Sequence, residues 1–119
     1  MGRKAGAMAQ TRHRRSERVL MDVPVLIRGE SPDQRAFWEE TFTVTVNAHG
    51  ALLMMASKVS LGQKLVLRNP NQDEREGRVS YMGSTYAGLA QVAVEFTHPA
   101  PEFWPVNSPP PDWQSFQRS

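Results

Sequence analysis

The 119-residue chain contains no cysteine. This absence excludes disulfide bonds, cysteine-ligated zinc and catalysis by a thiol. The chain also lacks any apolar run that approaches the roughly 20 residues of a membrane-spanning helix. Its first residues are basic, but no apolar stretch follows them, so no secretory signal is expected. Together these absences favour a protein of the reducing cytoplasm.

Motifs for catalysis and for metal binding are missing as well. His13, His49 and His98 are scattered and form neither an H-x-x-H nor an H-E-x-x-H pair, which argues against a metal site. No G-x-S-x-G or Walker-type glycine loop is present. The acidic residues stand in turns and at strand edges, where a solvated charge is the usual explanation. We therefore expect a protein that is not an enzyme and that needs no cofactor.

Charge is unevenly distributed along the chain, although the formal net charge is only +2. Residues 1–18 contain six basic residues and one acid, whereas residues 19–119 contain eight basic and eleven acidic residues. A basic arm on a mildly acidic body indicates an anionic partner, such as a nucleotide, a nucleic acid or a lipid surface. The simpler alternative is a solvated arm that keeps the protein soluble. Because residues 1–13 lack periodicity, we expect them to be disordered.

Short segments with alternating apolar residues fill the middle of the chain. In the clearest of them, Phe42, Val44 and Val46 alternate with threonines, which is typical of a strand. Residues rich in glycine, proline and asparagine separate the segments, and residues 83–88 read as a loop. The expected strands are residues 23–28, 41–46, 51–55, 64–68, 75–82 and 91–96. This pattern predicts an all-β barrel or sandwich.

Residues 99–119 differ from the rest because prolines and aromatic residues crowd there, and the prolines forbid a long regular element. Pro101 to Trp104 is expected to form one helical turn with proline at its first position. We expect Phe103 and Trp104 to pack against the strands. For Trp113 two alternatives stay open: it packs in the same way, or it belongs to a peptide that docks elsewhere.

An arginine cluster stands directly before the first apolar segment. Residues 14–18 read R-R-S-E-R, so that Arg14 and Arg18 are four positions apart and Arg15 is adjacent to the first. Arginine presents a flat fork of donors that matches phosphate oxygens and the acceptor edge of guanine. Such a cluster is common in solvated arms and in nucleic-acid-binding arms, so it predicts little by itself.

A polar turn interrupts the strands at residues 45–50, T-V-N-A-H-G. Asn47 offers an amide that both donates and accepts, and Gly50 permits a close approach of backbone or ligand. His49 is expected to be exposed. Taken alone, the segment is most simply an ordinary hairpin turn. An arginine arm held beside it, however, would make a site for a phosphorylated, planar ligand.

These features resemble the PilZ domain family, whose members are six-stranded β-barrel receptors for cyclic di-GMP in bacterial second-messenger signalling. The family signature is R-x-x-x-R in the N-terminal arm, then (D/N)-x-S-x-x-G before small and apolar residues, then a last strand of the V-x-V-E-F kind. The matching segments here are residues 14–18, 45–50 and 92–96. The resemblance covers about residues 12 to 98 and implies a six-stranded antiparallel barrel.

The composition and the resemblance together divide the chain into residues 1–13, the disordered basic arm, residues 14–98, the barrel domain with its arginine motif, and residues 99–119, the tail rich in proline and aromatic residues. The resemblance also implies a set of roles. Arg14 and Arg18 would contact the phosphates and the O6/N7 edge of guanine, supplemented by Arg15. Asn47 and Gly50 would line the turn beneath the ligand.

Two positions depart from the signature. Thr45 stands where the family has Asp or Asn, and Asn47 stands where it has Ser. The favoured interpretation is a cyclic di-GMP-binding module that acts on a partner protein. One alternative is an adaptor that keeps the fold and binds a protein but no nucleotide. A less favoured one is a nucleic-acid-binding barrel, against which the acidic body and the lack of an interleaved basic and aromatic face both argue.

Overall fold

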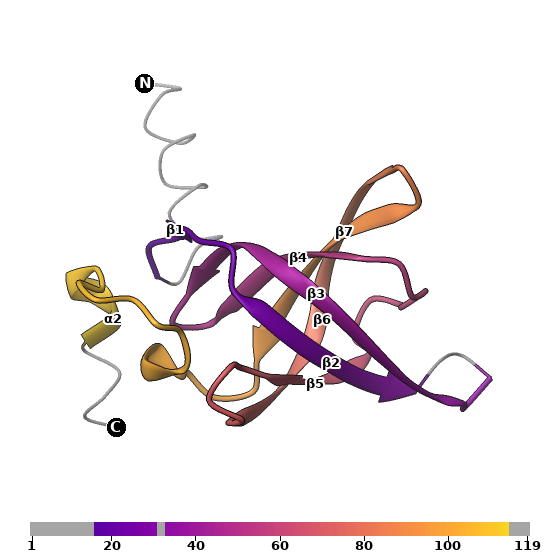
Figure 1. Cartoon of the computed structure of the whole chain (residues 1–119), viewed down its shortest axis with the longest axis horizontal. Helices are drawn as coiled ribbons and strands as arrows, with labels where there is room; N and C mark the ends of the chain where they lie inside the picture. The colour runs from indigo at the N-terminus through magenta and orange to yellow at the C-terminus, as the bar shows by residue number, and fades with distance from the viewer. Residues whose placement is uncertain (1–15, 31–32, 115–119) are drawn as a thin grey trace, which may run out of the picture.

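The computed structural model describes residues 16–30 and 33–114 of the chain. Antiparallel strands dominate this part of the protein (Figure 1). The strands are β1 (Val19–Leu20), β2 (Pro24–Glu30), β3 (Ala36–Asn47), β4 (Gly50–Met55), β5 (Lys64–Arg68), β6 (Glu74–Tyr86) and β7 (Leu89–Phe96). They follow the order β1-β3-β2-β5-β6-β7-β4, and a further pairing of β3 with β4 closes six of them into a barrel with β1 outside. The predicted six-stranded antiparallel barrel is thereby confirmed.

Three strand boundaries differ from the sequence prediction. β3 begins at Ala36 rather than at residue 41, β6 continues to Tyr86 through most of the predicted loop at residues 83–88, and β7 begins at Leu89 rather than at residue 91. The short strand β1 was not predicted at all. These added residues pair through their backbones beyond the core, and most of their side chains are exposed or half-buried. No apolar alternation therefore marks them in the sequence.

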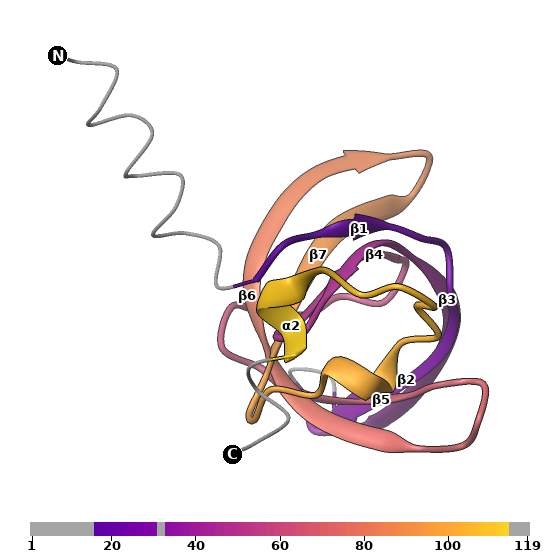
Figure 2. The same cartoon turned by 90° about the vertical axis from the view of Figure 1, so that its left-hand side faces the viewer.

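The barrel interior is filled by the inward-facing residues of β2–β7. The buried apolar members are Val25, Ile27, Val46, Leu53, Met55, Leu65, Leu67, Val79, Val92, Val94 and Phe96. One end of the barrel is closed by the tail, which forms a 3-10 turn η1 (Pro101–Phe103) and a short helix α2 (Pro111–Gln114), as Figure 2 shows end-on. None of the described helices is long and apolar enough to cross a membrane.

The tail contributes directly to the core. The predicted helical turn with proline at its start is confirmed at Pro101. Phe103 and Trp104 are buried, as expected from the sequence, and Trp113 is fully buried too. For Trp113 the structure therefore selects packing on the barrel over docking elsewhere. These rings lie at the end of the barrel where β3 turns into β4. The tail therefore contacts that turn, through the hydrogen bond from Trp104 to the backbone oxygen of Asn47.

An ion cluster joins β2, β5 and β6 on the outside of the barrel. Glu74 accepts hydrogen bonds from Arg28 Nη2 over 2.9 Å and from Arg68 Nη2 over 2.8 Å. The hydrogen bonds from Arg28 and Arg68 lower the pKa of Glu74 below its usual value of 4.5. A carboxyl whose folded-state pKa is lowered stabilises the fold above its unfolded pKa, and this stabilisation is lost as the pH falls through the folded value.

The Glu74→Gln variant should therefore show a weaker fall of unfolding free energy with acidification below about pH 5 than the wild type does. Urea unfolding followed by circular dichroism across this range measures the slope. The Glu40→Gln variant removes the same charge at an exposed position of β3 and serves as the control. Identical slopes in the wild type and the Glu74→Gln variant would contradict the assignment.

Candidate ligand-binding site

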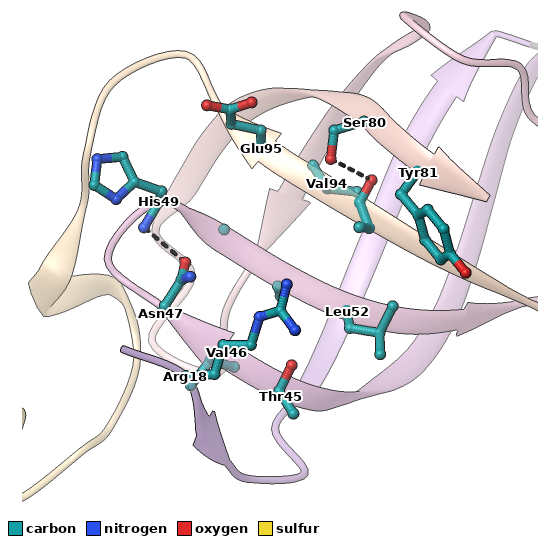
Figure 3. A pocket seen from close by; sticks show the side chains of 13 residues that line it. Arg18, Thr45, Val46, Asn47, His49, Leu52, Ser80, Tyr81, Val94 and Glu95 are labelled. Carbon is teal, nitrogen blue, oxygen red and sulfur yellow. Dashed lines mark hydrogen bonds between the residues drawn. The ribbon is translucent and has the colours of Figure 1, made fainter. Parts of the chain in front are cut away.

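A pocket of about 710 Å³ lies on the outer face of the barrel, over β3, β4, β6 and β7 (Figure 3). Small-molecule sites in proteins measure about 300–1,000 Å³, and the volume of this pocket falls in that range. The lining residues are Arg18, Thr45, Val46, Asn47, His49, Gly50, Ala51, Leu52, Ser80, Tyr81, Ala93, Val94 and Glu95.

One row of paired residues crosses the pocket from rim to rim. Tyr81 pairs with Ala93, Ala93 with Leu52, and Leu52 with Thr45. The small side chain of Ala93 keeps the middle of the row low, while the ring of Tyr81, 54% exposed, stands at one rim. The hydroxyl of Thr45 stands at the other. A low apolar floor beside an aromatic ring suits a flat ring system, since bases stack on aromatic faces.

Gly50 is required where β4 passes β7. A Cβ atom built on Gly50 would lie 1.9 Å from the carbonyl oxygen of Val94. The close approach that the sequence predicted at this glycine is therefore made by the backbone of β7. Gly50 therefore allows β4 and β7 to approach each other closely, and it lines the pocket at that point.

Ser16 ties the arginine motif to the turn after β3. It is only 1% exposed, and its Oγ accepts a hydrogen bond from the backbone N–H of Ala48 over 3.0 Å. The same Oγ is hydrogen-bonded to Nδ1 of His49 over 3.1 Å. The Ser16 carbonyl accepts from Nδ2 of Asn47 over 3.2 Å. These three bonds bring the motif to the turn, and the sequence assigned no role to this serine.

Arg18 lies two residues beyond this anchor and lines the pocket. In Figure 3 its side chain reaches over the floor between Val46 and Leu52, and the hydroxyl of Thr45 is turned to the same side. Arg14 and Arg15 lie outside the described residues, so their roles stay predictions. Of the residues singled out from the sequence, the structure brings Arg18, Thr45, Asn47 and Gly50 to one pocket.

The turn is braced by its own hydrogen bonds. Asn47 donates to Ser16 and accepts from the backbone N–H of His49 through Oδ1 over 2.9 Å. The backbone oxygen of Asn47 accepts from Nε1 of Trp104 over 2.9 Å. His49 is buried, so the expectation that it is exposed was wrong: its ring is held by Ser16. An amide has two N–H groups and two carbonyl lone pairs, so the bonds to Ser16 and His49 use one of each on Asn47.

The pocket also contains residues that sequence reasoning missed. Ser80 and Tyr81 come from β6, and Ala93 and Glu95 come from β7. The pairing register shifts between Val79 and Tyr81, so alternation along β6 does not reveal which side chains face the pocket. Only the register between strands places them there. Among the described residues, no cluster of histidine, aspartate or glutamate could hold a metal ion.

Comparison with known proteins gives a likeness among the solved structures. A scan of the sequence against protein-family models finds no match, and a search of curated proteins finds none either. Among solved structures, the chain is similar to the Inhibitor of motility MotI/DgrA of Bacillus subtilis, with a TM-score of 0.57 and 17% identity. The match covers 88% of this chain and 48% of the other, so this chain spans about half the length of that neighbour. At this identity the likeness shows the fold alone.

Proposed function

We propose that this protein is a non-catalytic signalling module that binds cyclic di-GMP in the pocket over β3, β4, β6 and β7. One observation carries the proposal: two motifs that are 31 residues apart are hydrogen-bonded to each other, and Arg18 and the turn line the same pocket. The PilZ-like fold supports it, because the sequence resemblance places the ligand of that family at the same two motifs.

The side chains of the pocket suit the chemistry of this ligand. Cyclic di-GMP carries two phosphates and two guanines. Arg18 offers a bidentate, charge-assisted contact to a phosphate, and Arg14 and Arg15 would add to it. Thr45 and Asn47 line the pocket and would be partners for a guanine edge. The ring of Tyr81 provides a face on which a base can stack.

The module would act by binding rather than by catalysis. A ligand held between Arg18 and the floor would cover the pocket and change the surface at this side of the barrel. A partner protein would then read that surface.

Titration calorimetry of the full chain with cyclic di-GMP tests the proposal, and the Arg18→Ala variant locates the site. Loss of a charge-assisted hydrogen bond costs about 1.5–3 kcal/mol, so we expect the affinity to fall by about 10- to 150-fold. Because the contact is ionic, the affinity of the wild type should also fall as salt is raised.

The control for this titration is Arg35→Ala. Arg35 is an exposed arginine at the opposite end of β3, 3.6 Å from Asp33, and its removal lowers the net charge by the same amount. Equal losses in the two variants would show attraction to charge without a site. Absence of heat, together with absence of NMR shifts at high ligand concentration, would refute cyclic di-GMP binding.

A second candidate function is an adaptor that keeps this fold and binds no nucleotide. Two observations favour it. Thr45 supplies one hydroxyl where the PilZ signature has a carboxylate or an amide. Half of the hydrogen-bonding groups of the Asn47 amide are already bonded to Ser16 and His49. The two candidates differ in what happens when a carboxylate is restored at position 45.

The Thr45→Asp variant should bind cyclic di-GMP more tightly than the wild type by about 10- to 150-fold, because a carboxylate accepts two guanine N–H donors. Calorimetry measures the change, and Thr85→Asp, which adds the same charge on the β6–β7 hairpin, is the control. Binding that appears only in Thr45→Asp would favour the adaptor. Tight binding by the wild type would eliminate it. Changing Asn47 as well is undesirable because it would break the brace to Ser16.

A further inference from the structure

The tail bonds both main-chain polar groups of Glu17, the residue directly before Arg18. The Glu17 N–H donates to Oδ2 of Asp112 over 2.9 Å. The Glu17 carbonyl accepts from Nε1–H of Trp113 over 2.7 Å, and the Trp113 ring is fully buried. Two consecutive residues, 95 and 96 positions away in the sequence, therefore fix the backbone of the arginine motif.

The same stretch is bonded from its other side by the turn after β3. Ser16 uses its hydroxyl and its carbonyl there, on Ala48, His49 and Asn47. Four polar groups of two consecutive residues thus have distant partners, and the partners of Ser16 and of Glu17 come from different parts of the fold. Figure 2 shows α2 lying beside the first described residues, at the end of the barrel that the tail closes.

We propose that Asp112 and Trp113 are positioning residues for the ligand pocket. They hold Ser16 and Glu17 against the turn, and this places Arg18 over the pocket floor. Only the coupling to the ligand rests on the proposed function. The positioning of Arg18 by the tail does not require a ligand. Coupling between two sites is reciprocal. A ligand held by Arg18 therefore strengthens the hold of the tail on Glu17, and release of the tail weakens the hold on the ligand.

A purely hydrophobic role for Trp113 predicts different behaviour. If the ring only fills the end of the barrel, its N–H group and the neighbouring carboxylate contribute nothing to the arginine segment. Three variants separate these roles. Trp113→Phe keeps an aromatic ring and loses the donor, Asp112→Ala loses the acceptor, and Asp112→Asn keeps an oxygen that can accept from Glu17.

Limited trypsin digestion of the ligand-free full chain measures how firmly residues 16–18 are held against the barrel. Cleavage after Arg18 requires local opening, and mass spectrometry identifies it by the new terminus at Val19. We expect Trp113→Phe and Asp112→Ala each to raise this rate roughly 3- to 10-fold, the ratio expected for one net hydrogen bond. Asp112→Asn should stay close to the wild type. Cleavage after Arg78, inside β6, reports global unfolding and should rise less than cleavage after Arg18.

Two results of the digestion would overturn the proposal. One is an unchanged rate after Arg18 in both Trp113→Phe and Asp112→Ala. The other is a parallel rise after Arg18 and Arg78, which would mean that the tail only stabilises the whole barrel. Neither result depends on whether cyclic di-GMP binds.

Hydrogen exchange of the Trp113 indole N–H then tests the coupling to the ligand. If opening of the tail requires release of the ligand, exchange slows by the factor 1 + [L]/Kd, which is about 100-fold at 100 times Kd. The exposed indole of Trp38 is the internal control. Unchanged Trp113 exchange with ligand bound would overturn the coupling. Absence of binding would overturn the proposed function, while the digestion would still decide the positioning.

Discussion

The Gly50→Ala variant is expected to lose about 3 kcal/mol or more of its unfolding free energy, since forced overpacking costs about 1–3 kcal/mol and a strained backbone adds to it. A Cβ at this position would lie 1.9 Å from the carbonyl oxygen of Val94 and 3.2 Å from the Cα of Glu95. Both atoms belong to the backbone of β7, which cannot rotate away as a side chain can. Gly50 also has a φ of +155°, which side chains rarely adopt.

Urea unfolding measures this loss, and Gly62→Ala separates the clash from the strain. Gly62 has a φ of +81° but no atom within 4 Å of a built Cβ. Gly62→Ala should therefore lose only the unfolding free energy that the strained backbone costs, about 1–2 kcal/mol. A loss in Gly50→Ala no greater than that in Gly62→Ala would contradict the packing of β4 on β7. Because Gly50 lines the pocket, we also expect Gly50→Ala to lose ligand affinity in any fraction that folds.

The strands of this barrel were predictable because most of them bury every second residue. β5 and β7 illustrate this, with Leu65, Leu67, Val92 and Val94 buried in strict alternation. This alternation is a local property of the sequence, and local patterns are what sequence reasoning detects. The strand pattern alone left a barrel and a sandwich open, and the resemblance to the PilZ family implied the closed barrel.

β3 shows where alternation fails. Phe42, Val44 and Val46 alternate with threonines, yet Phe42 and Val44 are exposed, while Thr43 and Val46 are buried. The pairing register shifts between Thr43 and Thr45, so the strand changes face at that point. The buried Thr43 hydroxyl accepts from the N–H of Val23 and donates to the carbonyl of Met21, which satisfies it. Alternation reveals neither the bulge nor these partners.

The pocket was predictable only in part for a related reason. Two of its walls are the arginine motif and the turn. Each of them is a contiguous segment of the sequence, so each could be recognised. The rim at Tyr81 depends on a shifted register between β6 and β7. The anchor depends on Ser16, whose partners lie more than 30 residues away. Neither residue type attracts attention by itself, so only the three-dimensional pairing assigns them a place.

The tail gives the other large expected effect. Trp104→Ala should lower the unfolding free energy by about 3–5 kcal/mol, the usual loss for a large buried aromatic residue. Trp104 is 3% exposed. Its ring stacks on Phe96 with centroids 5.8 Å apart and meets Phe103 edge-on at 4.8 Å. Its Nε1–H also satisfies the backbone oxygen of Asn47.

Denaturant unfolding of three variants divides this effect into its parts. Trp104→Phe keeps an aromatic ring but leaves the Asn47 oxygen without its donor, so we expect a smaller loss of about 1–3 kcal/mol. Trp38→Ala removes a tryptophan that is 59% exposed and has Arg28 over its ring, and the loss of unfolding free energy should stay below about 1 kcal/mol. Equal losses in Trp104→Ala and Trp38→Ala would contradict a tail that belongs to the core. If Trp104→Phe also weakens ligand binding while Trp38→Ala does not, the turn that carries Asn47 is held in place by the tail.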